Sequence, residues 1–359
     1  MSMTTPDQLT TGSETRRQRV AIVNFLFRFQ SFFGLFAIFV LAVVFSPIRN
    51  NANIFLRPNN LINVLLFASE TGILAIGMTL VILVGGIDLS VGSIMALIGV
   101  ASADLILNTR TIPLPILGDL FVGRLPVIIV YPLMLLMGLF IGWVNGWVSE
   151  RFKIPSFITT LAMLSIARGL AHVWSQDNAY QLAYGPDLAD PLYKALASPI
   201  GSTGIPAPVV IMLVCGFIVG WLLNNTLFGR HIYAVGGNPT AARLSGINVS
   251  RLRVILFMLC GMFAALAAMI HTARLNQGSP NESQGYELNA IAAVVIGGTS
   301  LAGGKGTIVG SISGAIILQI LDNILGLNNV DSNVQLVVKG ILVLTVVALQ
   351  QLRPDETES

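Results

Sequence analysis

An eight-residue pattern, Gly-Gly-x-x-Leu-[Ser/Ala]-x-Gly, occurs twice in the chain: residues 85–92 read GGIDLSVG and residues 297–304 read GGTSLAGG. Each of these glycine octets follows an aliphatic run, at 81–84 and at 294–296, and precedes another apolar segment. Glycine-rich backbone at membrane depth is tolerated only where it is buried in protein or lines a cavity, and transporters place substrate pathways at such breaks. The repeat predicts two discontinuous hairpins and an internal duplication. Small-residue packing in two unrelated helix pairs is the alternative.

The composition is that of a membrane protein. Of 359 residues, 54% are apolar and only 10% are charged, against about 25% charged in ordinary globular proteins, and the mean hydropathy is +0.78. A membrane span needs about 20 predominantly apolar residues. We therefore predict an all-α integral membrane protein with about ten transmembrane helices, near 30–46, 61–84, 90–107, 126–148, 155–175, 207–225, 252–273, 288–301, 306–325 and 334–351.

Loop charges predict the orientation. If residues 1–29 are cytoplasmic, the inner segments hold 12 Lys and Arg residues and the outer segments hold 6, as the positive-inside rule requires. We expect a cytoplasmic N-terminal tail at 1–29, one polytopic membrane domain at 30–351, and a cytoplasmic tail at 352–359. The 226–251 loop is then internal, and the 176–206 loop is external.

Several classes of function are not supported. A net charge of +3 without a basic cluster gives no reason to expect a nucleic-acid partner. Cys215 and Cys260 lie in apolar segments and the three histidines are scattered, so we expect no metal site. Gly304-Lys305-Gly306-Thr307 fails the phosphate-loop pattern, because Thr299 replaces the first glycine and Gly306 replaces the Ser or Thr.

A charged residue inside a membrane span costs free energy, so the charged residues in the predicted spans are expected to have a structural or functional role. Asp88 lies at the tip of the first octet, where it could favour the positive end of the next helix while Ser90 caps it; a direct pathway role is the alternative. Glu70 and Arg168 lie deep in the second and fifth spans, and a buried pair between them would satisfy both charges. Lys339 is expected to extend its ammonium to the membrane surface.

The internal loop carries the signals of a short helix. Asn238 suits an N-cap, Pro239 the first helical position and Gly246 the stop. Such a helix outside the bilayer is either a linker or a docking element. In the fourth span, Gly138, Gly142 and Gly146 predict close approach of a neighbouring helix.

Four segments together resemble the permease subunit of the ribose/xylose-type bacterial ABC sugar importers. They are 85–93 (GGIDLSVGS), 154–161 (IPSFITTL), the loop from 228–230 (FGR) to 246–248 (GIN), and 287–301 (ELNAIAAVVIGGTSL). They occur in order over about residues 60–345. Asn289 stands where many relatives carry Asp, so the resemblance does not depend on a charge at this position.

The resemblance implies a monosaccharide importer of the bacterial inner membrane that is not itself an enzyme. It implies a homodimer of permeases, a separate ATPase that holds the ATP and magnesium, and a periplasmic sugar-binding protein; we expect no cofactor on this chain. It makes the loop helix a coupling helix that docks on the ATPase, with Gly237, Asn238, Pro239, Ala241, Ala242, Arg243 and Gly246 at or near the contact. It makes the octets part of the pathway and inner gate, through Gly85, Gly86, Asp88, Ser90, Gly297, Gly298, Thr299 and Ser300.

A neutral, hydroxyl-rich sugar needs polar groups along its path. The candidates in predicted spans are Asn63, Ser69, Thr79, Ser90, Thr159, Ser165, Gln319 and Asn323. Two other functions remain open. An ion-coupled secondary transporter would need Glu70 as its coupling carboxylate. An intramembrane enzyme would need clustered His, Asp or Ser residues, and the sequence shows no such cluster.

Overall fold

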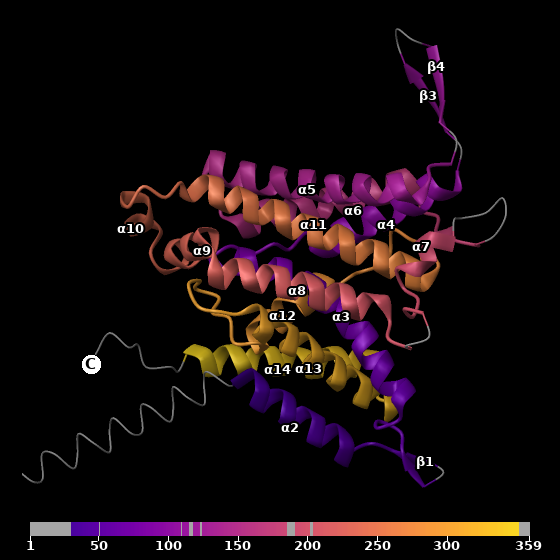
Figure 1. The fold of residues 1–359 in the computed structure, drawn as a ribbon, viewed down its shortest axis with the longest axis vertical. Coiled ribbons are helices and arrows are strands. Elements are labelled where there is room, and N and C mark those ends of the chain that lie inside the picture. Colours follow the sequence, from indigo (N-terminus) through magenta and orange to yellow (C-terminus); the bar gives the residue numbers. More distant parts are fainter. Residues whose placement is uncertain are drawn as a thin grey trace, which may run out of the picture.

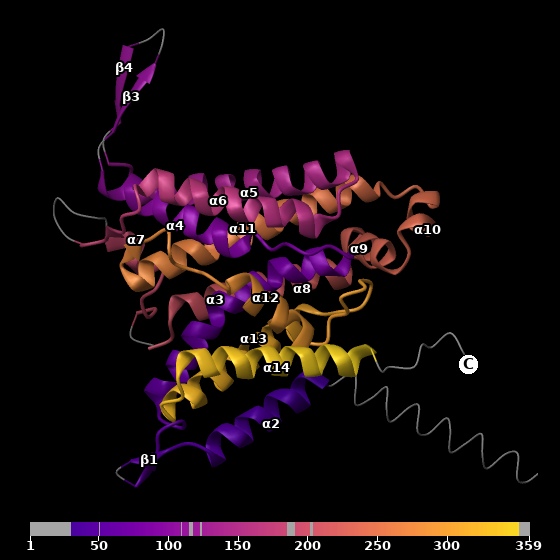
Figure 2. The ribbon, with the colours of Figure 1, turned by 180° about the vertical axis from the view of Figure 1, so that it is seen from behind.

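The computed structural model describes residues 30–49, 51–108, 110–114, 118–122, 124–184, 191–201 and 204–351. Its long helices lie roughly side by side, with α9 and α10 at one end of the assembly and α7 at the other (Figures 1 and 2). The helices are α2 (Gln30–Val44), α3 (Pro58–Leu83), α4 (Val91–Leu107), α5 (Val127–Phe152), α6 (Ser156–Ser175), α7 (Pro191–Ala195), α8 (Ala207–Asn225), α9 (Leu227–Gly237), α10 (Pro239–Leu244), α11 (Val249–Leu275), α12 (Tyr286–Ile296), α13 (Ile308–Leu327) and α14 (Ser332–Gln351).

The structure agrees with the predicted helical membrane protein. Each of the ten predicted ranges overlaps a helix, although the eighth, 288–301, extends past the end of α12. Within the described residues, six helices are long and apolar enough to cross a bilayer: α3, α5, α6, α8, α11 and α13. The apolar parts of α2, α4, α12 and α14 are shorter. The predicted tails, 1–29 and 352–359, lie outside the described residues.

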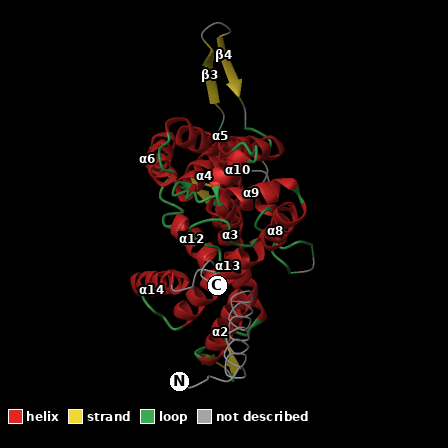
Figure 3. Ribbon diagram, turned by 90° about the vertical axis from the view of Figure 1, so that its left-hand side faces the viewer, coloured by secondary structure: helices red, strands yellow, loops and turns green. Residues whose placement is uncertain are grey.

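Helix α3 lies near the middle of the helical assembly (Figure 3) and packs against both α11 and α13. All of its residues from Ala68 to Leu83 are buried. On the other side of α11 lies α5, and the glycines predicted to allow close approach lie at this contact. A Cβ on Gly138 or Gly142 would overlap backbone of α11, and one on Gly146 would lie 2.8 Å from the Cα of Val254. The prediction of close helix packing is therefore confirmed.

The connections contain structure that the sequence reading missed. Strands β3 (Arg110–Leu114) and β4 (Gly118–Val122) form an antiparallel hairpin between α4 and α5 that projects from the helices (Figure 1). In the loop after α6, β5 (Tyr180–Gln181) pairs with β6 (Gln277–Gly278). A third pair, β1 (Ile48–Arg49) and β2 (Ala52–Asn53), follows α2.

The range predicted as the eighth span is a broken element. Helix α12 has 11 residues, about 16 Å of helix, against a hydrocarbon core of about 30 Å. The segment before it runs back along α4: a Cβ on Gly278 would overlap the Gly99 carbonyl, and one on Gly92 would lie 2.6 Å from the Ser283 carbonyl oxygen. The chain thus reaches the first turn of α4 before α12 begins.

Candidate functional site

Three glycine-containing segments meet at the end of the molecule that carries α10. This glycine junction comprises 83–85, 236–237 and 303–304. The Gly304 amide donates a hydrogen bond to the Leu83 carbonyl oxygen at 2.9 Å. A Cβ on Gly236 would overlap both of these groups, and one on Gly303 would lie 3.1 Å from the Gly85 nitrogen. The two octets and the end of α9 are therefore in direct backbone contact.

Two different structural constraints require glycine in the octets. Gly85 and Gly298 have φ values of +74° and +89°, in a region that is unfavourable for residues with a Cβ. Gly86 has ordinary φ, but a Cβ there would lie 2.9 Å from the Val81 Cγ1 atom. A Cβ on Gly297 would overlap backbone of α13. Positive φ at two of these positions and close packing at the other two thus each require glycine.

The first octet is held by the start of α6. Between α3 and α4 its backbone is non-helical, and its amides need partners from elsewhere. The Ser156 hydroxyl accepts from the Ile87 amide at 3.2 Å. The Thr160 hydroxyl accepts from the Leu89 amide at 3.0 Å and donates to the Ile87 carbonyl at 3.2 Å. The motif at 154–161 thus binds the motif at 85–93.

The capping role predicted for Ser90 is wrong, whereas the predicted effect of Asp88 on the dipole of α4 stays a prediction. Ser90 makes no capping hydrogen bond to α4. Its backbone amide and hydroxyl instead donate to the Asp88 carboxylate at 2.9 and 2.6 Å, and its hydroxyl accepts from the Asn145 amide at 2.9 Å. All three side chains are fully buried. Asp88 therefore closes a tight turn, and Asn145 of α5 is a partner that the sequence analysis missed.

The second octet is stabilised mainly by its own backbone. The Ser300 amide donates to the Lys305 carbonyl oxygen at 2.8 Å, which closes the loop before α13. Thr299 is fully buried, and its hydroxyl oxygen makes no hydrogen bond to the described residues. The Tyr233 hydroxyl of α9 donates to the Gly306 carbonyl at 2.9 Å. The loop after this octet is thus tied to the helix that precedes α10.

The predicted loop helix is present. The Asn238 side chain accepts hydrogen bonds from the Thr240 and Ala241 amides at 3.0 and 2.9 Å, Pro239 is its first residue, and Gly246 has φ +88°. Helix α9 was not predicted, although Thr226 caps it and Ile232 and Val235 bury one face. These are sequence signals that could have revealed it.

The loop helix also borders a cavity beside the first octet. This pocket has a volume of about 500 Å³. Arg243 of α10 and Arg253 of α11 line it together with Gly85 and Gly86. Arg253 pairs with Glu150 at 3.1 Å and donates to the Val84 carbonyl oxygen at 3.4 Å. The loop helix and the first octet thus share one polar pocket.

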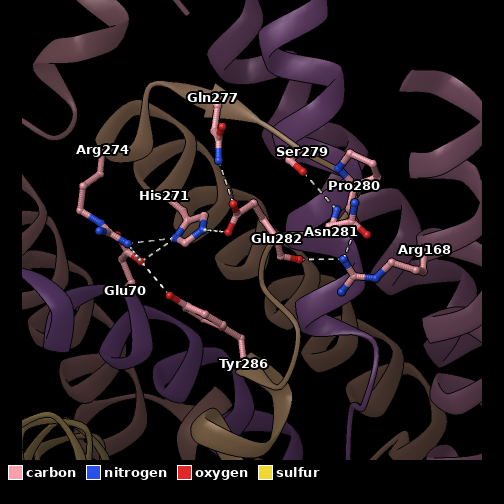
Figure 4. Close-up of polar contacts among 10 residues, drawn as sticks. All are labelled: Glu70, Arg168, His271, Arg274, Gln277, Ser279, Pro280, Asn281, Glu282 and Tyr286. Carbon is pink, nitrogen blue, oxygen red and sulfur yellow. Dashed lines mark hydrogen bonds and ion pairs between the residues drawn. The ribbon is translucent and has the colours of Figure 1, made fainter. Parts of the chain in front are cut away.

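A second polar site, the Glu70 cluster, lies at the other end of α11 (Figure 4). It comprises Glu70, His271, Arg274, Glu282 and Tyr286. Glu70, whose side chain is 1% exposed, accepts from the Arg274 Nε at 2.5 Å and lies 2.8 Å from His271 Nδ1. The second His271 nitrogen lies 3.4 Å from the Glu282 carboxylate. The cluster joins α3, α11 and the segment that leads to α12.

The predicted pair of Glu70 with Arg168 is wrong. Arg168 instead donates to the backbone carbonyls of Pro280 and Glu282 at 2.6 and 2.7 Å (Figure 4). It therefore fixes the segment between α11 and α12 against α6. The cation that pairs with Glu70 is Arg274 of α11, and the spacing of residues in the sequence could not identify it. Lys339 likewise pairs with Asp322 at 3.3 Å.

The candidate sugar-path residues do not converge on one surface. Asn63 and Ser165 are exposed on the outside of the helices. Thr79 donates to Ser311 at 2.7 Å, and Asn323 exchanges amide hydrogen bonds with Asn60. Ser69 donates to its own helix. Thr159 is 8% exposed, and its hydroxyl makes no hydrogen bond to the described residues. Gln319 is half-buried.

A bundle of apolar helices with buried glycine breaks and a capped surface helix defines a membrane transport subunit rather than a soluble enzyme. The chain belongs to the family described as branched-chain amino acid transport system / permease component, which matches residues 60–347.

The names of individual relatives refer to sugars. The chain is 40% identical to the ribose import permease protein RbsC of Escherichia coli K12 over 88% of this chain and 91% of that protein. It is 38% identical to RbsC of Bacillus subtilis, over 94% and 97%, and 35% identical to the xylose transport system permease protein XylH of Haemophilus influenzae, over 89% and 95%. No solved structure matches the chain.

Proposed function

We propose that this chain is the permease subunit of an ATP-driven importer that carries a monosaccharide across the bacterial inner membrane. The names of its relatives support a pentose-like sugar, although the family description refers to amino acids. We further propose ten spans, of which the eighth is the broken element that contains α12, with both termini cytoplasmic and a homodimer of permeases. ATP and magnesium would be held by a separate ATPase, and a periplasmic protein would deliver the sugar.

The glycine junction is the observation that carries the mechanism. Helix α10 lies at one end of the molecule (Figure 1) and is joined through α9 to both octets. An ATPase that displaces α10 would therefore move backbone at 83–85 and 303–304 directly. Because packed interfaces switch between discrete arrangements rather than deform smoothly, the octets suit an inner gate.

The surface of α10 supports docking rather than a linker role. Leu244 is 85% exposed, the largest exposed fraction among the large hydrophobic side chains of the described residues. Ala241 and Arg243 are also exposed, whereas Ala242 is 4% exposed and faces the protein. An exposed leucine beside an arginine at the end of a capped helix is suited to a groove on a partner. Ala242 is thus the member of the predicted set least able to make contact.

The ion-coupled alternative is not favoured. It requires a carboxylate that can take up an ion, and Glu70 is already neutralised by Arg274 and bonded to His271. The named relatives are also permeases of sugar systems.

Cross-linking tests the coupling proposal. Cysteine is introduced at exposed Ala241 or, as a matched control, at buried Ala242, in the permease co-expressed with its ATPase. Ala241→Cys should cross-link to cysteines placed around the ATPase groove, and Ala242→Cys should not. Leu244→Asp should reduce co-purification of the ATPase. An assembled complex in which no α10 position cross-links would refute the proposal.

A further inference from the structure

A groove lies on the outer face of α5 and α11, at the end of the molecule that carries α10. Its volume is about 600 Å³, and α5 forms an outer edge of the helical assembly (Figure 1). Its apolar part is formed by Trp143 and Trp147 from α5 and by Val254, Ile255 and Met258 from α11. Arg151 and Arg251 stand at its polar end.

The apolar part has the form of a lipid-facing surface. Trp143 and Trp147 are 39% and 42% exposed, and their rings stack with centroids 5.8 Å apart. Phe140 extends the stack on one side, at 5.8 Å, and on the other side Phe152 meets Trp147 edge to face, with centroids 5.9 Å apart. Tryptophan is enriched where a span meets the membrane surface. The stack therefore places this end of α5 at that surface.

The polar end carries an excess of positive charge. Glu150 also lines the groove, but its carboxylate pairs with Arg253. Arg151 and Arg251 are exposed. Arg251 lies in the first turn of α11, where the helix dipole disfavours a cation. Helix stability thus does not explain this arginine, whereas the same dipole and both guanidinium groups would attract an anion.

We propose that this groove binds an anionic phospholipid from the leaflet on the α10 side. Its phosphate would lie between Arg151 and Arg251, and an acyl chain would lie along Trp143, Trp147 and Met258. Basic pockets between helices at a membrane surface recognise anionic head groups in this way. A second copy of the chain fits less well. A two-fold contact centred on this groove would bring the two arginine pairs together.

Native mass spectrometry of the purified full-length permease tests the proposal. The protein is exchanged into micelles that contain equal amounts of phosphatidylglycerol and phosphatidylcholine with identical acyl chains. We expect the permease to retain phosphatidylglycerol roughly twentyfold more than phosphatidylcholine, because two arginines near the head group each contribute severalfold to the affinity. Arg151→Gln/Arg251→Gln should abolish most of this preference.

The control removes two exposed positive charges at the same end of the molecule. Arg230→Gln/Lys305→Gln has the same charge as the test variant and should keep the preference for phosphatidylglycerol. Trp147→Ala should lower retention of both lipids. Equal retention of the two lipids by the unaltered protein would overturn the proposal. So would a test variant that loses permease dimers while its lipid retention is unchanged, since the face would then be a subunit interface.

Discussion

The amide of Gly304 donates its hydrogen to the carbonyl oxygen of Leu83, 2.9 Å away. Leu83 is the last residue of α3, and the last carbonyls of a helix have no partner within the helix. The second octet therefore completes the end of the helix that leads into the first octet. A substitution that displaces the backbone of one octet should therefore also displace the backbone of the other.

Gly236 and Gly237 allow a direct test of this junction. A Cβ on Gly236 would overlap the Leu83 carbonyl oxygen and the Gly304 nitrogen, whereas one on neighbouring Gly237 meets nothing within 4 Å. Gly236→Ala should lower stability by about 2 kcal/mol, because backbone must move to admit the methyl group. Gly237→Ala should leave stability unchanged or slightly raised. Thermal unfolding in detergent, followed by tryptophan fluorescence, measures both; equal melting temperatures would contradict the junction.

Thr159 and Thr160 are neighbours with opposite environments. Thr160→Val leaves the partly buried Leu89 amide without its acceptor, so it should cost about 1–3 kcal/mol. The Thr159 hydroxyl is buried without a hydrogen bond in the described structure, so Thr159→Val should be neutral or stabilising. Unfolding experiments on the two variants check this order. Sugar uptake adds a second readout: if Thr159 lies on the path, Thr159→Val should reduce uptake without loss of stability.

The sequence predicted the positions of helices better than it predicted which side chains contact each other. The ranges of the helices and the caps of α10 follow from local signals, namely apolar length and the Asn238-Pro239 pair, which act within a few residues. Partners such as Asn145 with Ser90, or Arg274 with Glu70, join segments that are distant in sequence. Their contacts depend on how helices rotate about their axes, and no spacing rule fixes that rotation.

The same reason explains the weak list of sugar-path residues. A polar residue in an apolar span can face a pathway, a neighbouring helix or its own backbone. Thr79 faces Ser311, and Ser69 bonds to its own helix. The broken form of α12 was missed for another reason. Residues 288–301 are apolar enough to read as a span, and the course of the segment before them is revealed only by its packing on α4.

Glu70 should be important for stability. Glu70→Gln preserves the shape of the side chain but leaves the Arg274 guanidinium, which is 15% exposed, without its carboxylate. Breaking a buried ion pair in this way costs about 3–5 kcal/mol. The exposed pair of His172 with Asp177 is a control, because Asp177 is 82% exposed; Asp177→Asn should change little. Glu70→Gln/Arg274→Gln should recover part of the loss in chemical unfolding, and strict additivity of the two single changes would show that the residues are not coupled.

Arg168 should control the mobility of the segment between α11 and α12. Its guanidinium donates to two backbone carbonyls of this segment, and the segment passes the first turn of α4 on its way to α12. Arg168→Leu removes both bonds, so amide hydrogen exchange at 279–285 should accelerate at least tenfold. Arg168→Lys should give an intermediate rate, because an ammonium lacks the planar fork that reaches two acceptors at once. The neighbouring Gly169→Ala variant, where a Cβ meets nothing within 4 Å, should exchange as the unaltered protein does. If exchange in Arg168→Leu stayed at that level, the segment would be held by its packing on α4 and not by the arginine.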